Sequence, residues 1–450
     1  MKCIEDEIPF ELPEGWEWCR VRDIAAVKGG KRLPKGVGFS PCRTAHAYIR
    51  VTDMKNHSIN TDDLKYISEE VFLQIKNYTI SKDDLYVTIA GTIGVTGEVP
   101  TELDGMNLTE NAVKITNIQI NKTYLCLIIQ SEFVQQQFQD KTHQVAMPKL
   151  ALERILSTLI PVCTITTQSA MVSKFVEMDS LINQIREEKE ILAETVSLTK
   201  SKILDLAIRG KLVPQNPDDE PASVLLERIR AEKEELIKQG KIKRDKKESV
   251  IFKGEDNSYY QQTGTLIENI NDWNLDDIPI NWELCCLGEI CDYGNCVNVD
   301  TKDIDEEAWV LDLEDIEKDS GKVIHKIRKY ERDSSSTKHL FKKGQVLYSK
   351  LRPYLNKVVL ADEKGFCTSE ILPLNFSNVV EPQYALYYLM SPTFLKYANR
   401  CSYGVKMPRL GTADGRKAVF PLPPFEEQRR ISQHISKIFM EIDDISNMLI

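Results

Sequence analysis

The chain has 450 residues, of which 42% are hydrophobic and 28% charged, and its formal net charge is −10. This length accommodates about two or three domains with cores of their own, and the composition is that of an ordinary globular protein. No apolar run approaches the roughly 18–20 residues of a membrane helix, and the first residues lack the basic start and apolar stretch of a signal peptide. We therefore expect a cytoplasmic protein that makes no membrane contact.

Although the net charge of the whole chain is negative, two of its segments are basic. Residues 20–55 contain nine Lys and Arg against two Asp, and residues 341–360 contain five Lys and Arg and no acid. A basic surface on an otherwise acidic protein favours a polyanionic ligand such as nucleic acid. Scattered solvated cations are the alternative for either segment alone.

The sequence repeats itself over a long interval. Residues 148–168 return with an offset of 260 as residues 408–428, and the segment that ends in Trp16 returns as the one that ends in Trp282. A period of this length indicates a duplicated domain, because solenoid units are only a few tens of residues long. Two similar domains predict two similar ligands, or one ligand with two similar parts.

Short strands and helices are expected in each copy. The patterns predict strands over residues 48–51 and 84–89, the second with a counterpart over 344–349. A helix over residues 122–139 has its counterpart over 382–395. Each copy is therefore predicted to be a mixed α/β (α+β) domain.

A coiled-coil helix is predicted over residues 168–208, where side chains follow a 4-3 spacing for five heptads. Such a helix is about 60 Å long, and Gly210 is suited to end it. Nine of the eleven positions in this seam are apolar: Met171, Phe175, Met178, Ile182, Ile185, Lys189, Leu192, Val196, Thr199, Ile203 and Leu206.

A proline-containing loop follows, and Pro221 is placed to begin a second helix, over residues 221–240. Residues 241–274 are charged, then polar, and are predicted to be a linker. The end of the second copy repeats the apolar 4-3 spacing: Ile431, Ile435, Ile438, Ile442, Ile445 and Leu449.

Apolar seams in both copies predict that the two long helices pack against each other. Packing of the second helix on its own domain is the alternative. The second helix stops at Ile450, short of its counterpart, which leaves open whether Ile450 is the native C-terminus.

No motif of a catalytic site is found. The chain lacks the G-x-x-x-x-G-K-[ST] loop of nucleotide-binding enzymes and the Asn-Pro-Pro-aromatic motif of amino-methyltransferases, and its six histidines are scattered. An acidic cluster is attributed to a solvated turn: Asp312, Glu314, Asp315 and Glu317. Four neighbouring cysteines lack zinc-site spacing and are attributed to buried thiols: Cys285, Cys286, Cys291 and Cys296. We therefore expect a non-catalytic chain that binds no metal.

Several of these segments resemble the specificity subunit of type I restriction-modification systems, over essentially the whole chain. Residues 201–215 and 220–226 resemble that family's central conserved region, and residues 421–431 resemble its junction between recognition domain and conserved helix. The regions around Trp16 and Trp282 resemble the start of a target recognition domain, in which a segment like Leu351-Arg352-Pro353-Tyr354-Leu355-Asn356-Lys357 is common. The short C-terminal helix departs from the family pattern.

The resemblance implies a division into four parts. These are a first target recognition domain (1–165), a central conserved helical region that forms a coiled-coil spacer (166–245), a second target recognition domain (246–425) and a C-terminal conserved helix (426–450). It further implies that the two long helices form an antiparallel coiled coil, which separates the duplicated domains.

By the same resemblance, each recognition domain reads one half of a bipartite, asymmetric site in double-stranded DNA. The helices set the spacer and dock two modification (methyltransferase) subunits, and restriction (translocase-nuclease) subunits join for cleavage. This chain binds no cofactor, whereas S-adenosylmethionine, ATP and Mg are expected on the partner subunits. The recognised sequence, the spacer length and any pairing with another copy are left open.

Basic side chains are the candidates for DNA contact, because Arg and Lys neutralise phosphates and Arg can bond guanine at two points. In the first domain the candidates are Lys31, Arg32, Lys35, Arg50 and Lys149. In the second domain they are Lys350, Arg352, Tyr354, Lys406 and Arg409. A packed ring is the alternative for Tyr354, and a turn-forming role is the alternative for Asp53 and Asp312.

Two other functions stay open at this point. One is a non-catalytic coiled-coil scaffold, unrelated to restriction, whose two α/β domains hold protein partners. The other is the recognition half of a fused methyltransferase-nuclease, against which the missing methyltransferase motifs argue.

Overall fold

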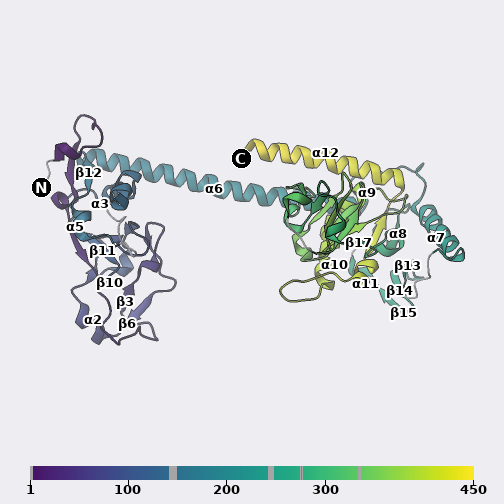
Figure 1. The fold of residues 1–450 in the computed structure, drawn as a ribbon, viewed down its shortest axis with the longest axis horizontal. Coiled ribbons are helices and arrows are strands. Elements are labelled where there is room, and N and C mark those ends of the chain that lie inside the picture. Colours follow the sequence, from purple (N-terminus) through teal and green to yellow (C-terminus); the bar gives the residue numbers. More distant parts are fainter. Residues whose placement is uncertain are drawn as a thin grey trace. The chain divides into compact units, whose positions relative to one another are not determined.

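The computed structural model describes residues 4–140, 149–241, 248–273, 275, 277–332 and 336–449 (Figure 1). The chain divides into two compact units, Met1–Ile185 and Arg186–Ile450. Each contains strands and helices around its own core, so the predicted duplicated α/β architecture is confirmed. The division falls within one long helix, α6 (Ile165–Ile208), which confirms the predicted helix over residues 168–208. No helix in the described ranges is both long and apolar enough to span a membrane.

The described residues of unit 1 form twelve short strands and five short helices before α6. The strands are β1 (Glu17–Arg20), β2 (Ala26–Gly29), β3 (His46–Ile49), β4 (Met54–Lys55), β5 (Ser58–Ile59), β6 (Lys65–Ile67), β7 (Thr79–Ile80), β8 (Leu85–Thr88), β9 (Thr96–Glu98), β10 (Met106–Leu108), β11 (Ala112–Thr116) and β12 (Leu159–Val162). The helices are α1 (Val21–Ile24), α2 (Glu69–Ile75), α3 (Lys122–Gln130), α4 (Glu132–Asp140) and α5 (Leu152–Leu156), with 3-10 turns η1 (Ile4–Glu7), η2 (Val51–Asp53) and η3 (Thr101–Leu103). Two four-stranded sheets, in the orders β6-β3-β10-β7 and β2-β11-β8-β9, form the body.

Unit 2 contains the end of α6 and the second copy. Its strands are β13 (Ser249–Lys253), β14 (Tyr259–Thr263), β15 (Leu266–Asn269), β16 (Glu283–Cys286), β17 (Val297–Val299), β18 (Trp309–Leu311), β19 (Ile327–Arg328), β20 (Lys338–Phe341), β21 (Val346–Ser349), β22 (Val358–Leu360), β23 (Gly365–Thr368), β24 (Ile371–Leu374) and β25 (Val419–Leu422). Its helices are α7 (Ala222–Lys238), α8 (Leu287–Ile290), α9 (Pro382–Met390), α10 (Pro392–Cys401), α11 (Thr412–Lys417) and α12 (Phe425–Leu449). The 3-10 turns are η4 (Asn271–Trp273), η5 (Thr301–Asp303), η6 (Leu313–Asp315), η7 (Lys329–Glu331) and η8 (Pro353–Leu355).

The two units share strand pairings. β1 pairs antiparallel with β12, as β16 does with β25, and β8 pairs antiparallel with β11, as β21 does with β24. Among the described strands, β3 pairs parallel with β10 in unit 1 and β18 pairs parallel with β23 in unit 2. The duplication read from the sequence is therefore a duplication of topology.

A glutamine at equivalent positions of the two copies explains part of the sequence repeat. Gln168, buried near the start of α6, accepts a hydrogen bond from the Asn121 amide at 2.9 Å, and Gln428 accepts one from the Glu381 amide at 2.8 Å. Asn121 and Glu381 are the N-cap residues of α3 and α9. In both copies the buried side chain of this glutamine thus joins a long helix to the start of the preceding helix pair. The bond satisfies a backbone N–H that would be costly to leave unpaired.

The single helices predicted over residues 122–139 and 382–395 are wrong, since each is two helices. The first breaks at Ser131 and the second at Ser391. Ser391 accepts a hydrogen bond from the Phe394 amide at 3.3 Å, and Pro392 follows it directly. An N-cap serine followed by proline begins a new helix, and the restriction that proline places on its predecessor ends the old one.

The linker predicted over residues 241–274 is also wrong in part. Residues 249–269 form the antiparallel sheet β13-β14-β15, in which Phe252 pairs with Tyr260 in register. The polar average of this segment hid short runs of aromatic and β-branched residues, which favour strands. The domain boundary predicted at 245/246 lies outside the described residues.

The two long helices pack against each other along only part of the predicted apolar seam. α12 runs antiparallel to the last turns of α6: Lys200 pairs with Asp443 and Leu204 shares a core with Ile435, which is fully buried. α12 also lies against α9, so packing on its own domain contributes as well (Figure 1). Five seam residues in the first half of α6 remain exposed: Met171, Phe175, Met178, Ile182 and Ile185.

A buried carboxylate joins α12 to the segment after α6. Glu427 accepts hydrogen bonds from Trp282 Nε1 at 3.1 Å and Gln215 Nε2 at 2.7 Å, and it is 1% exposed. Burial raises the pKa of Glu427 above its ordinary value, against the lowering effect of these hydrogen bonds.

We expect Glu427→Gln to remove a pH-dependent part of the stability. A carboxyl whose pKa is raised by folding contributes stability at low pH that is lost as the pH rises through the folded pKa. The wild-type chain should therefore gain stability relative to Glu427→Gln as the pH falls from 7 towards 4. Denaturant unfolding at both pH values measures the difference. Glu426→Gln, at an exposed neighbouring position, is the control, and an equal pH dependence in wild type and Glu427→Gln would contradict the expectation.

Candidate nucleic-acid interface

The first cluster of basic residues begins where β2 ends. The Gly30 amide donates to the Ala112 carbonyl at 3.1 Å, and the Lys31 amide donates to the Leu108 carbonyl at 2.9 Å. A Cβ on Gly30 would lie 2.0 Å from the Thr109 carbonyl oxygen. Glycine at this position therefore lets the backbone of residues 30–32 pass against the β10–β11 turn.

Glu110 is the centre of this cluster. Arg32 Nε donates to Glu110 Oε1 at 2.6 Å, and Lys149 Nζ donates to the Glu110 carbonyl at 3.3 Å. The Tyr48 hydroxyl bonds both the Lys31 carbonyl, at 2.8 Å, and Glu110 Oε2, at 3.3 Å. The structure thus brings together Lys31, Arg32 and Lys149, from segments over a hundred residues apart.

Arg32 presents its charge to solvent. Its side chain is 79% exposed, and the bond from Nε leaves its terminal Nη groups directed elsewhere. The hydrogen bond from Arg32 to Glu110 raises the pKa of Arg32, so its positive charge is maintained. Lys35 lies exposed on the same loop.

Arg50 is placed differently from the other candidates. Its Nη2 donates to Asp53 Oδ1 at 2.6 Å and to the Asp63 carbonyl at 2.7 Å, and its Nε donates to Asp53 Oδ2 at 3.1 Å. Asp53, 5% exposed, also caps the η2 turn by accepting from the Arg50 amide. The turn-forming alternative for Asp53 is therefore correct, and Arg50 neutralises this buried carboxylate.

We expect Arg50→Ala to act on stability and to leave DNA preference unchanged. Loss of the charged hydrogen bonds to Asp53 should lower the free energy of unfolding by about 1.5–3 kcal/mol. Thermal or denaturant unfolding measures this loss. Relaxed sequence preference at normal stability would instead place Arg50 among the DNA-reading residues.

The second cluster is held by backbone bonds between two segments. The Arg352 amide donates to the Pro408 carbonyl at 2.7 Å, and the Leu410 amide donates to the Lys350 carbonyl at 3.0 Å. Arg352 has a φ of 49°, in the left-handed region that non-glycine residues seldom adopt. Such strain persists only where the surroundings impose it, and it is frequent at functional sites.

Glu370 occupies the centre of the second cluster. Arg409 donates to it through Nε, at 3.0 Å to Oε2, and through Nη2, at 2.9 Å to Oε1. The Lys350 amide donates to the Glu370 carbonyl at 3.0 Å. Lys350, Arg352 and Arg409 are thus brought together around one glutamate.

Two further candidates lie beside this cluster. Tyr354 lies in η8, directly after Pro353, and the residue is 46% exposed, so it is not fully packed in the core. Lys406 lies in the loop before Arg409, where the neighbouring Val405 is 101% exposed and Tyr403 is 63% exposed. Tyr403 and Arg409 exchange backbone hydrogen bonds at 3.1 and 2.9 Å, which fix the base of this loop.

The acidic cluster at residues 312–317 is a turn that is solvated only in part: Glu314 and Glu317 are exposed, whereas Asp315 is buried. Asp315 is 0% exposed and accepts bonds from Arg332 Nη1 at 2.5 Å and Nη2 at 2.7 Å. Lys338 pairs with Asp312 at 2.8 Å. Asp315 also caps the Asp312 amide at 2.7 Å, the counterpart of the Asp53 cap in unit 1. Asp312 and Asp315 are therefore neutralised by bases distant in sequence.

The cysteines attributed to buried thiols lie mainly in the core of unit 2. Cys285, Cys286 and Cys291 are buried, and desolvation raises the pKa of Cys286 to about 12. Among the described residues, no group of three or more His, Cys, Asp and Glu is arranged to hold a metal ion.

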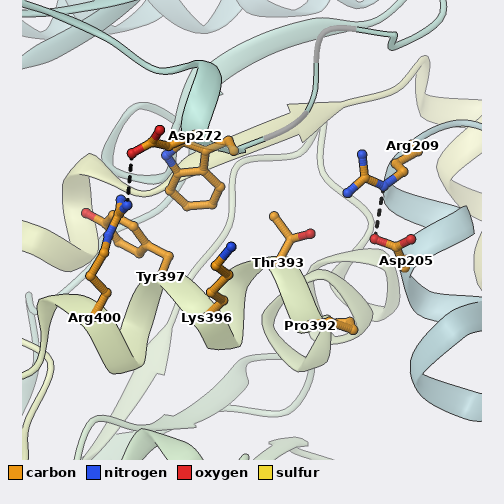
Figure 2. Close-up of a pocket in the computed structure, with 9 residues that line it drawn as sticks. Asp205, Arg209, Asp272, Pro392, Thr393, Lys396, Tyr397 and Arg400 are labelled. Carbon is orange, nitrogen blue, oxygen red and sulfur yellow. Dashed lines mark hydrogen bonds and ion pairs between the residues drawn. The ribbon is translucent and has the colours of Figure 1, made fainter. Parts of the chain in front are cut away.

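A pocket of about 210 Å³ lies in unit 2 between the end of α6, η4 and α10 (Figure 2). Both of its arginines pair within it: Arg209 Nε donates to Asp205 at 2.9 Å, and Arg400 Nη1 donates to Asp272 at 3.2 Å. Lys396 and Thr393 lie between the two pairs (Figure 2). Neither pair links α6 to the second copy; the end of α6 is held instead by Leu204, Ala207 and Ile208, which are buried in the core of unit 2.

Sequence reasoning missed the two glutamates at the cluster centres. Glu110 and Glu370 are separated by the same 260 positions that separate Lys149 from Arg409. The offset of 260 is therefore the sequence signal that links the two glutamates. They were not among the candidates, because only basic side chains and Tyr354 were expected to contact DNA.

Comparisons with known proteins agree with this architecture. The family model for the type I restriction modification DNA specificity domain matches residues 13–194 and 279–449. The two matches define a chain of two DNA specificity domains, and the chain belongs to the family of type I restriction-modification specificity subunits.

Curated relatives include two specificity subunits from Escherichia coli. The type I restriction enzyme EcoAI specificity subunit is 30% identical over 255 residues, and the EcoEI subunit is 32% identical over 251 residues. Each match covers 54% of this chain and 39% of the relative, so the chain spans well under two thirds of these relatives' length.

Two solved structures share the fold. A chain from a study of complex assembly and conformational transition of the type I R-M system matches with a TM-score of 0.57 and 16% identity, covering 98% of this chain and 94% of that chain. The HsdS subunit from Thermoanaerobacter tengcongensis matches with a TM-score of 0.50 and 16% identity, covering 99% and 94%.

Proposed function

We propose that this chain supplies sequence specificity to a type I restriction-modification complex, and that each recognition domain reads one half of a bipartite, asymmetric site in double-stranded DNA. The observation that carries the proposal is the recurrence of one glutamate-centred basic cluster at equivalent places in both units. A repeated frame with different flanking residues, such as Gly29-Gly30-Lys31-Arg32 opposite Gly294-Asn295-Cys296-Val297, suits two different half-sites.

Within each cluster the basic side chains divide into two roles. Exposed lysines such as Lys35 and Lys406 suit phosphate contact, which sets position without reading sequence. The guanidinium groups of Arg32, Arg352 and Arg409 suit base contact, because Arg can bond guanine at two points in the major groove.

The long helices would set the spacer and dock the partner subunits. Half-sites must lie at a defined distance and rotation along the duplex, so a rigid connection is required. α6 has 44 residues, and its last turns are buried in the core of unit 2 through Leu204, Ala207 and Ile208. Two modification subunits would bring S-adenosylmethionine and the methylation chemistry, and restriction subunits would bring ATP and Mg, which leaves this chain non-catalytic.

An exchange of residues 1–160 for the same region of another specificity subunit tests the proposal. We expect methylome sequencing of a host that carries the hybrid and its modification subunits to show a changed first half-site, an unchanged second half-site and an unchanged spacer. A change in both halves would overturn the assignment of one domain to one half-site.

Electrophoretic mobility shift distinguishes DNA reading from the alternative of a protein scaffold. Specific binding through several phosphate contacts should weaken steeply between about 50 and 200 mM salt. Binding that does not depend on salt, or no binding to any duplex in the presence of the modification subunits, would favour the scaffold.

A further inference from the structure

The glutamates at the cluster centres occupy the same place in both units. Glu110 lies just before β11, and Glu370 lies just before β24. These strands are equivalent, since β11 pairs with β8 as β24 pairs with β21. Both glutamate side chains are 23% exposed. The duplication has therefore kept a partly buried carboxylate at the centre of each basic cluster.

The cation that each carboxylate holds comes from a different segment. Glu110 binds Arg32, which follows β2, whereas Glu370 binds Arg409, which is equivalent to Lys149. Lys149 still contacts this region in unit 1, through the Glu110 carbonyl. The carboxylate is thus constant, and the arginine bound to it differs between the copies.

Each carboxylate accepts hydrogen bonds from only some of the N–H groups of its arginine. A guanidinium has five N–H groups; Glu110 accepts from Nε of Arg32, and Glu370 accepts from Nε and Nη2 of Arg409. Arg409 Nη1 also donates to the Met407 carbonyl at 3.3 Å, so one N–H remains on each Nη group of Arg409 and both Nη groups of Arg32 keep theirs, with the guanidinium planes oriented by the glutamates. A flexible arginine that is oriented before binding loses less conformational freedom when it bonds a base.

Ion pairing for stability alone explains the contact of Arg32 with Glu110 poorly. Arg32 is 79% exposed, and exposed ion pairs contribute little to folding. A glutamate at a DNA-facing surface would repel phosphate unless a cation covered it. The pair is therefore better suited to aim an arginine at a base edge than to hold the fold.

We propose that Glu110 and Glu370 are equivalent positioning residues that determine specificity, one in each recognition domain: Glu110 aims Arg32 at one half-site, and Glu370 aims Arg409 at the other. This inference rests on the proposed function, because it requires that each domain reads one half-site.

Methylome sequencing of hosts that carry the full chain with its modification subunits tests the inference. In Glu110→Gln, discrimination at one or two base positions of the first half-site should fall by about 5-fold to 100-fold, the range for one bidentate base contact. Arg32→Ala should relax the same positions, and the double variant should relax them no further, because the two residues act as one unit. Glu370→Gln and Arg409→Ala should do the same in the second half-site only.

Matched controls are glutamates that pair with arginines elsewhere in the same units. Glu153→Gln removes the pair with Arg22, and Glu363→Gln removes the pair with Arg328, and neither should change the methylated sequence. Thermal unfolding of every variant separates loss of reading from loss of fold, and Glu110→Asp should restore part of the discrimination.

Three results would overturn the inference. One is unchanged discrimination in Glu110→Gln while Arg32→Ala relaxes it. Another is an equal loss of methylation at all sequences, which indicates phosphate contact. The third is a loss of discrimination that follows the melting temperature across all variants. A wild-type complex that methylates no split sequence would instead overturn the proposed function and this inference together.

Discussion

Gly30→Ala is expected to disrupt the first unit at the point where its basic cluster begins. A Cβ at residue 30 would lie 2.0 Å from the Thr109 carbonyl oxygen and 2.5 Å from the Leu108 carbonyl oxygen, and both are backbone atoms. Because neither can rotate away, the backbone of residues 30–32 must move. We expect a loss of about 3 kcal/mol in the free energy of unfolding, at the upper end of the range for overpacking.

The same change should abolish reading of the first half-site. The Lys31 amide would leave the Leu108 carbonyl, and Arg32 would be displaced from Glu110. Methylome sequencing should then show loss or relaxation of one half-site, with the other retained. Gly29→Ala is the matched control, because nothing lies within 4 Å of a Cβ built there. Equal effects of the two substitutions would contradict this account.

Arg332→Ala is expected to destabilise unit 2 by about 3–5 kcal/mol, the usual cost of leaving a buried charge without its partner. Arg332 donates two hydrogen bonds to Asp315, which is 0% exposed, and it also pairs with Asp312 at 3.2 Å and Glu314 at 3.1 Å. Its removal would leave three carboxylates close together beside the core that contains Trp309.

Denaturant unfolding of the full chain measures this loss. Arg332→Lys should be intermediate, because lysine keeps the charge but cannot form the paired bonds of a guanidinium. Arg328→Ala is the control: its partner Glu363 is 37% exposed, so we expect a loss below about 1 kcal/mol. A loss of similar size for Arg328→Ala and Arg332→Ala would refute the assignment of Asp315 as a buried charge that Arg332 neutralises.

The sequence by itself determined the features that repeat along the chain. A 4-3 spacing predicted α6 almost to the residue, because helical periodicity is a local property. An offset of 260 predicted the duplicated topology, and the two basic segments predicted the surfaces that lie around Glu110 and Glu370. Composition gave a wrong prediction where the polar average of a segment obscured short strands, as in the sheet of residues 249–269.

Only the tertiary structure decided which charges meet. Arg32 and Arg50 are equally basic in the sequence, yet Arg50 neutralises the buried Asp53, whereas Arg32 is bound at the surface by a glutamate 78 positions away. It also decided that the first half of the α6 seam stays exposed while Ile435 is buried on its own unit. The physical reason is common to both cases. The partner of a side chain depends on where the backbone places residues distant in sequence, and no local spacing encodes that placement.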